Sequence, residues 1–385
     1  MPRKYASKEM IETIVGFDTT STKSNLDLVK FIEDYLSEYG VASHRVPNED
    51  NTKANLYAVV GPNVDGGVVL SGHTDVVPVD GQPWDTDPFT LTERDGKLFG
   101  RGTADMKSFY AIALSLVPEM IATNLKRPII FALSYDEELG CIGAPSMIAE
   151  MAKKLPRPKA VIVGEPTKME ISNSHKGGTC IETTVIGHEA HSSEVEQGVS
   201  AVLIASQLIV FIDAMMAENR AKRDPTIHFL PGYTTLASGT ISGGTAQNIL
   251  ARKCVFNWGV RCLPGEDPYH YIGRFEKKCR ELLKEMHEIS AECSITSVVY
   301  SNVPPLLAEE AGEAEALMVR LLGRNSTKAV SYGTEAGQFQ QGGFSTILCG
   351  PGSIEQAHQP NEFIEIAQVE QCENMLRRII QHQAK

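Results

Sequence analysis

The chain carries at Val68–Pro78 the stretch VVLSGHTDVVP, an apolar run with strand character that ends in a His-x-Asp pair. Gly72 and Pro78 mark the turn that contains this pair, His73 and Asp75. Neutral imidazole is the commonest metal ligand among protein side chains, and a carboxylate two residues away can orient it through a hydrogen bond. A single pair of this kind is also common in ordinary loops, so its meaning depends on the residues at the ends of the other strands.

Length and composition predict a two-domain globular protein. The chain has 385 residues, of which 42% are hydrophobic and 22% charged, and this length exceeds what one ordinary core accommodates. The net charge of −12 disfavours a nucleic-acid partner, because such binding needs a basic surface. No Lys/Arg-rich amphipathic helix is evident for a membrane surface, and no apolar stretch approaches the ~20 residues of a membrane span.

The expected compartment is the cytoplasm. The start of the chain, MPRKYASKEMIETIVGF, lacks the apolar region and cleavage site of a signal peptide, and its Glu residues disfavour a transit peptide. The eight cysteines are scattered, with no Cys-x-x-Cys pair. This usage is typical of reduced thiols in a cytoplasmic protein.

The first and last parts of the chain alternate helix and strand patterns. Helices are predicted over Lys8–Phe17, Ser24–Tyr39, Asp105–Ile121, Ala144–Ala152 and Glu310–Leu322 and from Ala367 onward, and strands over Leu56–Val60, Val68–Ser71, Ile129–Ser134, Ala160–Val163 and Ser345–Leu348. Such alternation predicts an α/β domain with a mixed, largely parallel sheet flanked by helices.

Between these parts the pattern changes near Cys180. Strands are predicted over Ile181–Ile186, Thr234–Ile241, Lys253–Val260 and Glu292–Tyr300, and helices over Val199–Met216 and Pro268–His287. The resulting order, β-α-β-β-α-β, is that of an α+β ferredoxin-like unit. We therefore predict a catalytic domain formed by residues 1–179 and 301–385, with a lid domain inserted at residues 180–300.

Candidate ligands come after several of the predicted strands of the larger domain. They are His73 and Asp75 after VVLSG, Asp136–Glu138 after IIFALSY, Glu165 after AVIVG and His358 in the loop after STILCG. Asp105 lies in GRGTADMKS at the start of a helix. Because ligands of open α/β sheets bind outside the carboxyl ends of the strands, these side chains are expected to meet at one edge.

Each candidate also has an ordinary structural interpretation. Asp105 could cap its helix, Asp136–Glu138 could be a solvated acidic turn, Glu165 could belong to a common loop dipeptide, and His358 could lie at the surface. Their joint placement at one sheet edge favours a metal site. Two histidines and several carboxylates without a thiol suit Zn²⁺ or Co²⁺. Two ions at about 3.5–4 Å would need a bridging carboxylate, and a carboxylate left off the metals could transfer protons as a general base and acid.

Six motifs together resemble the di-zinc M20 family of amidohydrolases and aminopeptidase-like enzymes. They are SGHTDVVP, GRGTADMK, DEELG, GEPT, GHEAHSS and GPGSIEQAHQPNEF, and they occur in the family's order over essentially the whole chain. The resemblance implies an aminopeptidase/phosphorylase-like fold with the inserted lid. Within the family, SHKGG, YGTEAG and PGSIEQAHQPNEFIE are similar to sequences of acetylornithine deacetylases.

Carried over by position, the resemblance implies a role for each residue of the metal site. His73 and Glu165 would bind one ion, Glu138 and His358 the other, with Asp105 bridging. Glu137 would be the general base and proton shuttle, and Asp75 would orient His73. The Asp105–Met106 peptide bond is expected to be cis.

The lid motifs resemble the family's substrate-binding positions. His191 in GHEAHSS would donate a hydrogen bond to the oxyanion, in this family from the partner subunit of a dimer, with His188 as its rival. Asn248 and Arg261 would hold the substrate carboxylate, although Arg261 could be an ordinary strand-end cation. Glu335 in SYGTEAG could pair with a substrate amine or only stabilise its loop.

The implied reaction is the metal-dependent hydrolysis of an N-acyl amino acid, best represented by N2-acetyl-L-ornithine giving L-ornithine and acetate. The expected cofactors are two Zn²⁺ ions, for which Co²⁺ can substitute. The expected assembly is a homodimer through the lid. The alternatives are a general aminoacylase, a succinyl-diaminopimelate desuccinylase-like hydrolase and an inactive binding homologue.

Overall fold

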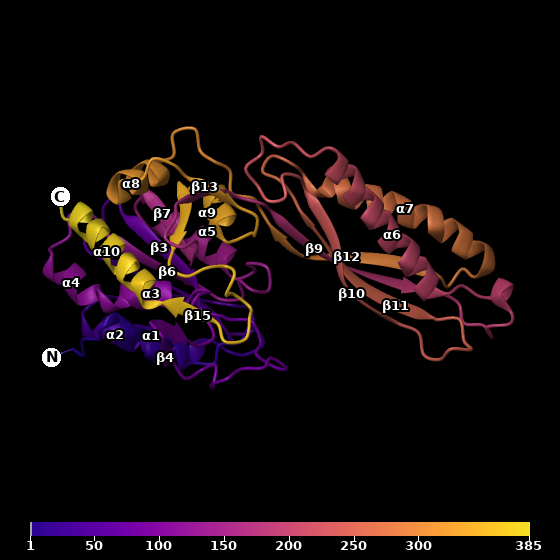
Figure 1. The fold of residues 1–385 in the computed structure, drawn as a ribbon, viewed down its shortest axis with the longest axis horizontal. Helices are drawn as coiled ribbons and strands as arrows, with labels where there is room; N and C mark the ends of the chain where they lie inside the picture. Colours follow the sequence, from indigo (N-terminus) through magenta and orange to yellow (C-terminus); the bar gives the residue numbers. More distant parts are fainter. Residues whose placement is uncertain (1) are drawn as a thin grey trace. The chain divides into compact units, whose positions relative to one another are not determined.

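The computed structural model describes residues 2–385, which divide into two compact units (Figure 1). The first unit contains residues 2–174, 306–329 and 334–385, and the second contains residues 175–305 and 330–333. The second unit therefore begins before the predicted boundary at residue 180. It also includes a short later segment that the sequence pattern did not indicate.

The first unit is built on an eight-stranded sheet in the order β1-β2-β6-β3-β7-β14-β8-β13. Its centre is parallel, since β3 pairs in parallel with β6 and β7, and β7 pairs in parallel with β14. The pairs β1–β2, β2–β6 and β14–β8 are antiparallel. The strands are β1 (Ser43–Pro47), β2 (Ala54–Val60), β3 (Val68–His73), β6 (Ile129–Ser134), β7 (Ala160–Pro166), β8 (Ser172–His175), β13 (Lys328–Val330) and β14 (Thr346–Gly350). The predicted mixed, largely parallel sheet is confirmed.

Helices cover both faces of this sheet. All residues of β3, β6 and β7 are buried, which explains why these strands read as continuous apolar runs. Contacts to the sheet come from α2, α3, α4, α5, α8 and α9, while α1 and α10 pack against α3. The helices are α1 (Ser7–Val15), α2 (Leu26–Glu38), α3 (Lys107–Ser115), α4 (Val117–Ala122), α5 (Ala144–Lys154), α8 (Glu313–Leu322), α9 (Ala336–Gln341) and α10 (Ile366–Gln383).

The helix predicted over Asp105–Ile121 is two helices in the structure. The first, α3, begins at Lys107, and α4 starts anew at Val117 with Pro118 in its first turn. Proline is tolerated there because the first-turn N–H groups have no partner within the helix. Asp105 consequently lies in the loop before α3. Its peptide bond to Met106 is cis, as the family resemblance implies.

A small antiparallel sheet joins the GRGTAD loop to the end of the chain. Its order is β15-β5-β4, with β4 (Thr92–Arg94), β5 (Lys97–Phe99) and β15 (Phe363–Glu365). Phe363 pairs with Phe99, so the segment after His358 lies beside the segment that precedes Asp105. These short strands were not predicted, because three residues are too few to establish a strand pattern.

The second unit has the predicted β-α-β-β-α-β order. Its elements are β9 (Gly178–Ile186), α6 (Ala201–Ala221), β10 (Thr235–Gly243), β11 (Lys253–Arg261), α7 (Pro268–Ile289) and β12 (Ser294–Val303), and a 3₁₀ turn at Val195–Gln197 precedes α6. The sheet is antiparallel in the order β10-β11-β9-β12, which is the arrangement of a ferredoxin-like unit. Both helices pack on the sheet around their own core, which contains Phe256, Trp258 and Phe275.

Helix α6 is an exception to the expectation that no stretch is apolar enough for a membrane span. It has 21 residues, and an 18-residue window within it has a mean hydropathy of 1.8, which satisfies length and composition criteria alone. Leu208, Ile212 and Met215 of this helix are buried in the core of the second unit, so it also has the character of a core helix. The prediction overlooked it because Ser206, Gln207 and Asp213 interrupt the apolar run.

Candidate metal centre

His73 ends β3 at the carboxyl edge of the central sheet. Its side chain is 1% exposed, and its Nε2 atom lies 3.0 Å from Oδ1 of Asp105 and 3.9 Å from Oε1 of Glu165. Glu165 itself lies in β7, the parallel neighbour of β3. The expected convergence at strand ends is therefore present for these three groups.

Asp75 contacts both His73 and the acidic turn. The Nδ1 atom of His73 is 2.9 Å from the backbone oxygen of Asp75, whereas the nearest carboxylate oxygen is 3.6 Å away. The carboxylate also accepts hydrogen bonds from the backbone N–H groups of Glu137 and Glu138, at 3.1 and 3.2 Å. Asp75 thus contacts His73 through its backbone oxygen and its carboxylate, and the carboxylate also holds the acidic turn in place.

The other imidazole approaches the same bridging carboxylate from the opposite loop. His358 places Nε2 3.0 Å from Oε2 of Glu138 and 3.4 Å from Oδ2 of Asp105. Asp105 therefore has one oxygen directed at each histidine. This is the arrangement that a bridging carboxylate between two ions requires.

The structure excludes two of the ordinary interpretations. In the part of the chain that the structure describes, the N-cap position of α3 is Met106, and no side chain caps that helix, so Asp105 does not act as its cap. The acidic turn is not a solvated surface feature either. Asp136 is buried and contacts Nζ of Lys53 at 2.5 Å, and the side chain of Glu138 is only 7% exposed.

Electrostatics in this cluster follow from burial of several like charges. Burial raises the pKa of Glu137 to about 8 and that of Glu138 to about 7, and nearby carboxylates add to both shifts. Burial also raises the pKa of Glu165, with Asp105 contributing. The pKa of Asp105, in contrast, is lowered. Burial acts to raise it, but the hydrogen bonds to His358 and His73 stabilise the charged form and outweigh burial.

These residues fit divalent cations. Among the described residues, two sets of side chains could each hold an ion, because the ligand atoms within each set lie within 4.8 Å of one another. The first set is His73, Glu137 and Glu165, and the second is His73, Asp105 and Glu138. Among the described residues, Oε1 of Glu138 is buried without a hydrogen-bond partner, and a buried unpaired oxygen is costly. Oxygen and imidazole nitrogen donors without thiolate suit Zn²⁺ and similar ions.

Comparisons with known proteins show which family the chain belongs to. Residues 69–382 match the family model described as "Peptidase family M20/M25/M40". The chain is 32% identical to an acetylornithine deacetylase of Pasteurella multocida (strain Pm70) over 98% of this chain and 96% of that protein. The corresponding enzyme of Proteus mirabilis (strain HI4320) is 32% identical over 97% of this chain and 95% of that protein. The chain belongs to peptidase family M20.

Solved structures share the fold of this M20 protein. An M20 family metallo-carboxypeptidase from Sulfolobus solfataricus has a TM-score of 0.78 at 15% identity, with 99% of each chain covered. A dinuclear metal-binding M20 peptidase from Bacillus subtilis has a TM-score of 0.63 at 12% identity, with 97% of each chain covered. Together with the family match, the comparisons show an amide-hydrolysing enzyme of the metallopeptidase type.

The predicted lid residues of the M20 enzyme lie in the second unit. His191 pairs with Ile249 in an isolated bridge, and Ser192 N–H donates to the backbone oxygen of Asn248 at 3.0 Å. His191 and Asn248 are therefore neighbours, with Nδ1 of His191 2.8 Å from the Ser193 hydroxyl. Arg261 is exposed at the end of β11. The rival His188 lies in the bridge to Val199, and its Nδ1 is buried without a partner among the described residues.

Glu335 occupies a buried position in the first unit of this M20 enzyme. Its side chain is fully buried, and its two carboxylate oxygens accept hydrogen bonds from Ser71 at 2.5 Å and Ser134 at 2.6 Å. Ser71 lies in β3 and Ser134 in β6. Of the two predicted roles of Glu335, these contacts favour stabilisation of its own loop over pairing with a substrate amine.

Sequence reasoning missed three residues around the site. Glu362 accepts backbone N–H bonds from the loop that carries Asp105, Arg101 pairs with Glu362, and Gln82 contacts the loop of His358. Arg101 and Glu362 lie in two motifs that carry the family resemblance, GRGTADMK and GPGSIEQAHQPNEF, but their types did not reveal which atoms they bind.

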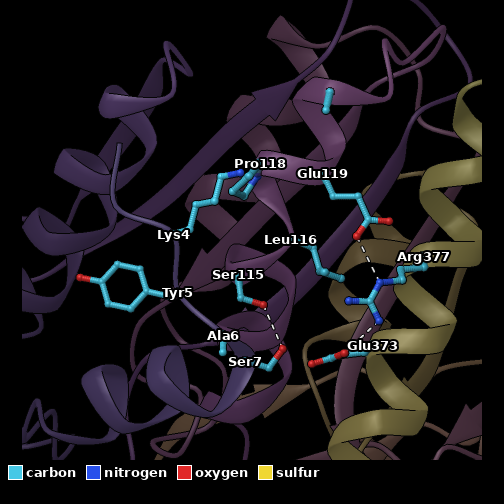
Figure 2. A pocket seen from close by; sticks show the side chains of 11 residues that line it. Lys4, Tyr5, Ala6, Ser7, Ser115, Leu116, Pro118, Glu119, Glu373 and Arg377 are labelled. Carbon is cyan, nitrogen blue, oxygen red and sulfur yellow. Dashed lines mark hydrogen bonds and ion pairs between the residues drawn. The ribbon is translucent and has the colours of Figure 1, made fainter. Parts of the chain in front are cut away.

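A separate cavity of about 430 Å³ lies among the N-terminal segment, the α3–α4 junction and α10 (Figure 2). Three of its charged side chains are paired with one another, since Arg377 lies 3.1 Å from Glu119 and 2.9 Å from Glu373. Ser7 and Ser115 are hydrogen-bonded to each other at 3.0 Å. None of its lining residues belongs to the metal cluster.

Proposed function

We propose that this M20 enzyme hydrolyses the amide of an N-acyl amino acid with a free α-carboxylate, with N2-acetyl-L-ornithine as substrate. The products are L-ornithine and acetate. The observation that carries the proposal is the convergence of two imidazoles on opposite oxygens of Asp105, with three further carboxylates around them. The choice of acyl group rests on the similarity of almost the whole chain to acetylornithine deacetylases.

We propose two divalent ions, Zn²⁺ with Co²⁺ as a substitute. His73 and Glu165 would hold one ion, Glu138 and His358 would hold the other, and Asp105 would contact both. When bound, the ions would polarise the scissile carbonyl and lower the pKa of an attacking water to about 7. The B. subtilis M20 peptidase of the same fold is described as dinuclear, which supports this stoichiometry.

Glu137 is the proposed proton carrier. Burial raises the pKa of its carboxyl above its ordinary value, toward the range in which a side chain can both accept and return a proton near neutral pH. In the proposed reaction Glu137 takes one proton from water as the oxygen bonds to the acyl carbon. The carbon–nitrogen bond then breaks, and Glu137 gives that proton to the departing amine.

The roles of the lid residues stay predictions from the family resemblance. His191 would donate a hydrogen bond to the oxyanion, and Arg261 with Asn248 would hold the substrate carboxylate. We also propose a homodimer through the second unit. Its support within this chain is the apolar exposure of Leu203 and Val210 on α6, which are 63% and 68% exposed.

The test combines metal removal with a substrate panel. Dialysis against a chelator is expected to abolish amine release from acetylornithine, because the ligand set then holds no ion, and Zn²⁺ or Co²⁺ is expected to restore it. The panel contains acetylornithine, succinyl-diaminopimelate and acetylmethionine, with metal content measured in parallel.

A preference for the succinylated compound would assign a desuccinylase, and a preference for acetylmethionine would assign a general aminoacylase. Metal-loaded protein that releases no amine from any of the three would contradict the proposed reaction. Protein that binds no metal and releases no amine would favour an inactive binding homologue.

Replacing Glu335 with Gln is expected to leave the preference for acetylornithine over acetyl-norvaline unchanged. The reason is that both of its oxygens are used by Ser71 and Ser134 inside the fold. Glu335→Ala should instead destabilise the first unit by about 1–3 kcal/mol, because two buried hydroxyls lose their acceptor. Steady-state kinetics and denaturant unfolding measure the two effects. A loss of the acetylornithine preference in Glu335→Gln would restore the amine-pairing role.

A further inference from the structure

We propose that Gln82, Arg101 and Glu362 form a positioning network that couples the two loops carrying Asp105 and His358. The proposal rests on the proposed function, because those two residues are proposed metal ligands. None of the three is itself placed as a ligand or as a residue that contacts substrate. Their contacts connect the two loops through an unbroken series of hydrogen bonds.

Glu362 holds the loop that ends in Asp105. Its side chain is fully buried, and Oε1 accepts hydrogen bonds from the backbone N–H groups of Ala104 at 2.8 Å and Asp105 at 3.0 Å. The other oxygen accepts the N–H of Gly102 at 3.1 Å. Three bonds from one carboxylate to one short loop determine where its backbone lies, and charge-assisted bonds of this kind are the stronger ones.

Arg101 extends the network from Glu362 to Gln82. Its side chain is 1% exposed, Nη1 donates to Oε2 of Glu362 at 2.7 Å, and Nη2 donates to Oε1 of Gln82 at 2.5 Å. The guanidinium carbon also lies 5.1 Å from the centre of the Trp84 ring, within the range of a cation–π contact. The planar fork of arginine thus contacts the acid and the amide at the same time.

Gln82 completes the connection to His358. Its Nε2 donates to the backbone oxygen of His358 at 2.9 Å, and its Oε1 also accepts Nε1–H of Trp84 at 3.1 Å. The orientation of the amide is determined by these partners, since exchanging its oxygen and nitrogen would place NH₂ against Arg101. The network therefore runs from the backbone of Asp105 to the backbone of His358.

Further bonds hold the loop of His358 beside the network. Nη1 of Arg101 donates to the backbone oxygen of Gln359 at 3.3 Å, and the N–H of Asp85 donates to Oδ1 of Asn361 at 2.8 Å. Gln82 is the residue of the network that bonds the backbone of His358 itself. His358 has a φ of 63°, its side chain is 52% exposed, and it lies between β14 and β15, outside any helix or strand. Its Nε2 must nevertheless be held 3.4 Å from the carboxylate of Asp105. The hydrogen bond from Gln82 helps to hold His358 at this distance, because groups that bond to metal ligands commonly orient them.

The test compares metal affinity in three full-length variants, with Zn²⁺ titrated by calorimetry in competition with a chelator. Gln82→Leu removes the bond to His358 and replaces the amide with an apolar group of similar size. Glu362→Gln keeps the shape but replaces one acceptor with a donor. Gln340→Leu is the matched control, since Gln340 also clamps a backbone group, bonding Leu307 N–H and C=O at 2.9 and 2.8 Å.

We expect Gln82→Leu to weaken one of two Zn²⁺ sites by about 10- to 100-fold and to leave the other unchanged. Glu362→Gln should weaken both sites, because Asp105 contacts both ions. Gln340→Leu should bind as the wild type does, and thermal unfolding of each variant separates loss of affinity from loss of fold.

Equal affinities in Gln82→Leu and Gln340→Leu, with two ions bound by the wild type, would overturn the network and leave the proposed function intact. Wild-type protein that binds no Zn²⁺ would overturn both. The visible spectrum of the Co²⁺-loaded protein provides a second readout, since a displaced His358 changes the coordination of one ion and a purely structural role would not.

Discussion

Replacing Glu137 with Gln is expected to lower kcat by about 10²- to 10⁴-fold while KM changes little. The amide has almost the same shape as the carboxylate but cannot take a proton from water or return one to the amine. The fold should persist, because Asp75 holds the turn through the backbone N–H of Glu137, which the substitution leaves in place. Steady-state kinetics with acetylornithine measure the effect.

Metal content decides whether Glu137 acts as a base or as a ligand. Glu137 is close enough to His73 and Glu165 to share an ion with them. Glu137→Gln protein that still binds two ions but does not turn over would support the base. A variant that has lost an ion would instead assign Glu137 to the ligand set. Glu355→Gln, at an exposed position, serves as the control and should retain full activity.

Replacing His73 with Ala is expected to reduce hydrolysis to the background of metal-free protein. The variant removes the nitrogen that lies between Asp105 and Glu165, so the proposed first ion loses a ligand. Loss of the hydrogen bond to the Asp75 backbone should cost about 1–3 kcal/mol of stability. Circular dichroism should therefore show a folded protein.

The control for this variant is His44→Ala. His44 lies on β1 of the same unit and stacks on Tyr57 at 4.9 Å between ring centroids, remote in sequence from every proposed ligand. It should retain metal and activity. A His73→Ala enzyme with wild-type turnover would exclude His73 from the metal site.

The acidic turn shows where sequence reasoning succeeded and where it stopped. The apolar run Ile129–Ser134 predicted a buried strand, and strand direction then predicted that Asp136–Glu138 emerge at the carboxyl edge. Which backbone N–H groups reach the carboxylate of Asp75 depended on how the turn folds back, and Asp136 in this turn has a φ of 54°. Residue spacing alone could not indicate that the carboxylate of Asp75 would bind the turn in addition to lying beside His73.

The role of Glu335 also could not be decided from the sequence. A glutamate in a motif typical of acetylornithine deacetylases was an equally good candidate for a substrate contact or for a structural bond. Only the position of the α9 N-terminus beside β3 and β6 placed its oxygens against Ser71 and Ser134. Contacts between residues so far apart in the chain are invisible to local patterns.

The stretch Val68–His73 and its parallel neighbours were readable from sequence, because burial on both faces requires continuous apolar strands and parallel strands deliver their following residues to one edge. The motif order likewise indicated the M20 family, and the change of pattern near Cys180 predicted an inserted second unit. The tertiary structure alone decided which oxygen of Asp105 faces which histidine, and how Gln82, Arg101 and Glu362 connect the two loops. These arrangements depend on side-chain directions between distant segments, and those directions are determined by packing rather than by local periodicity.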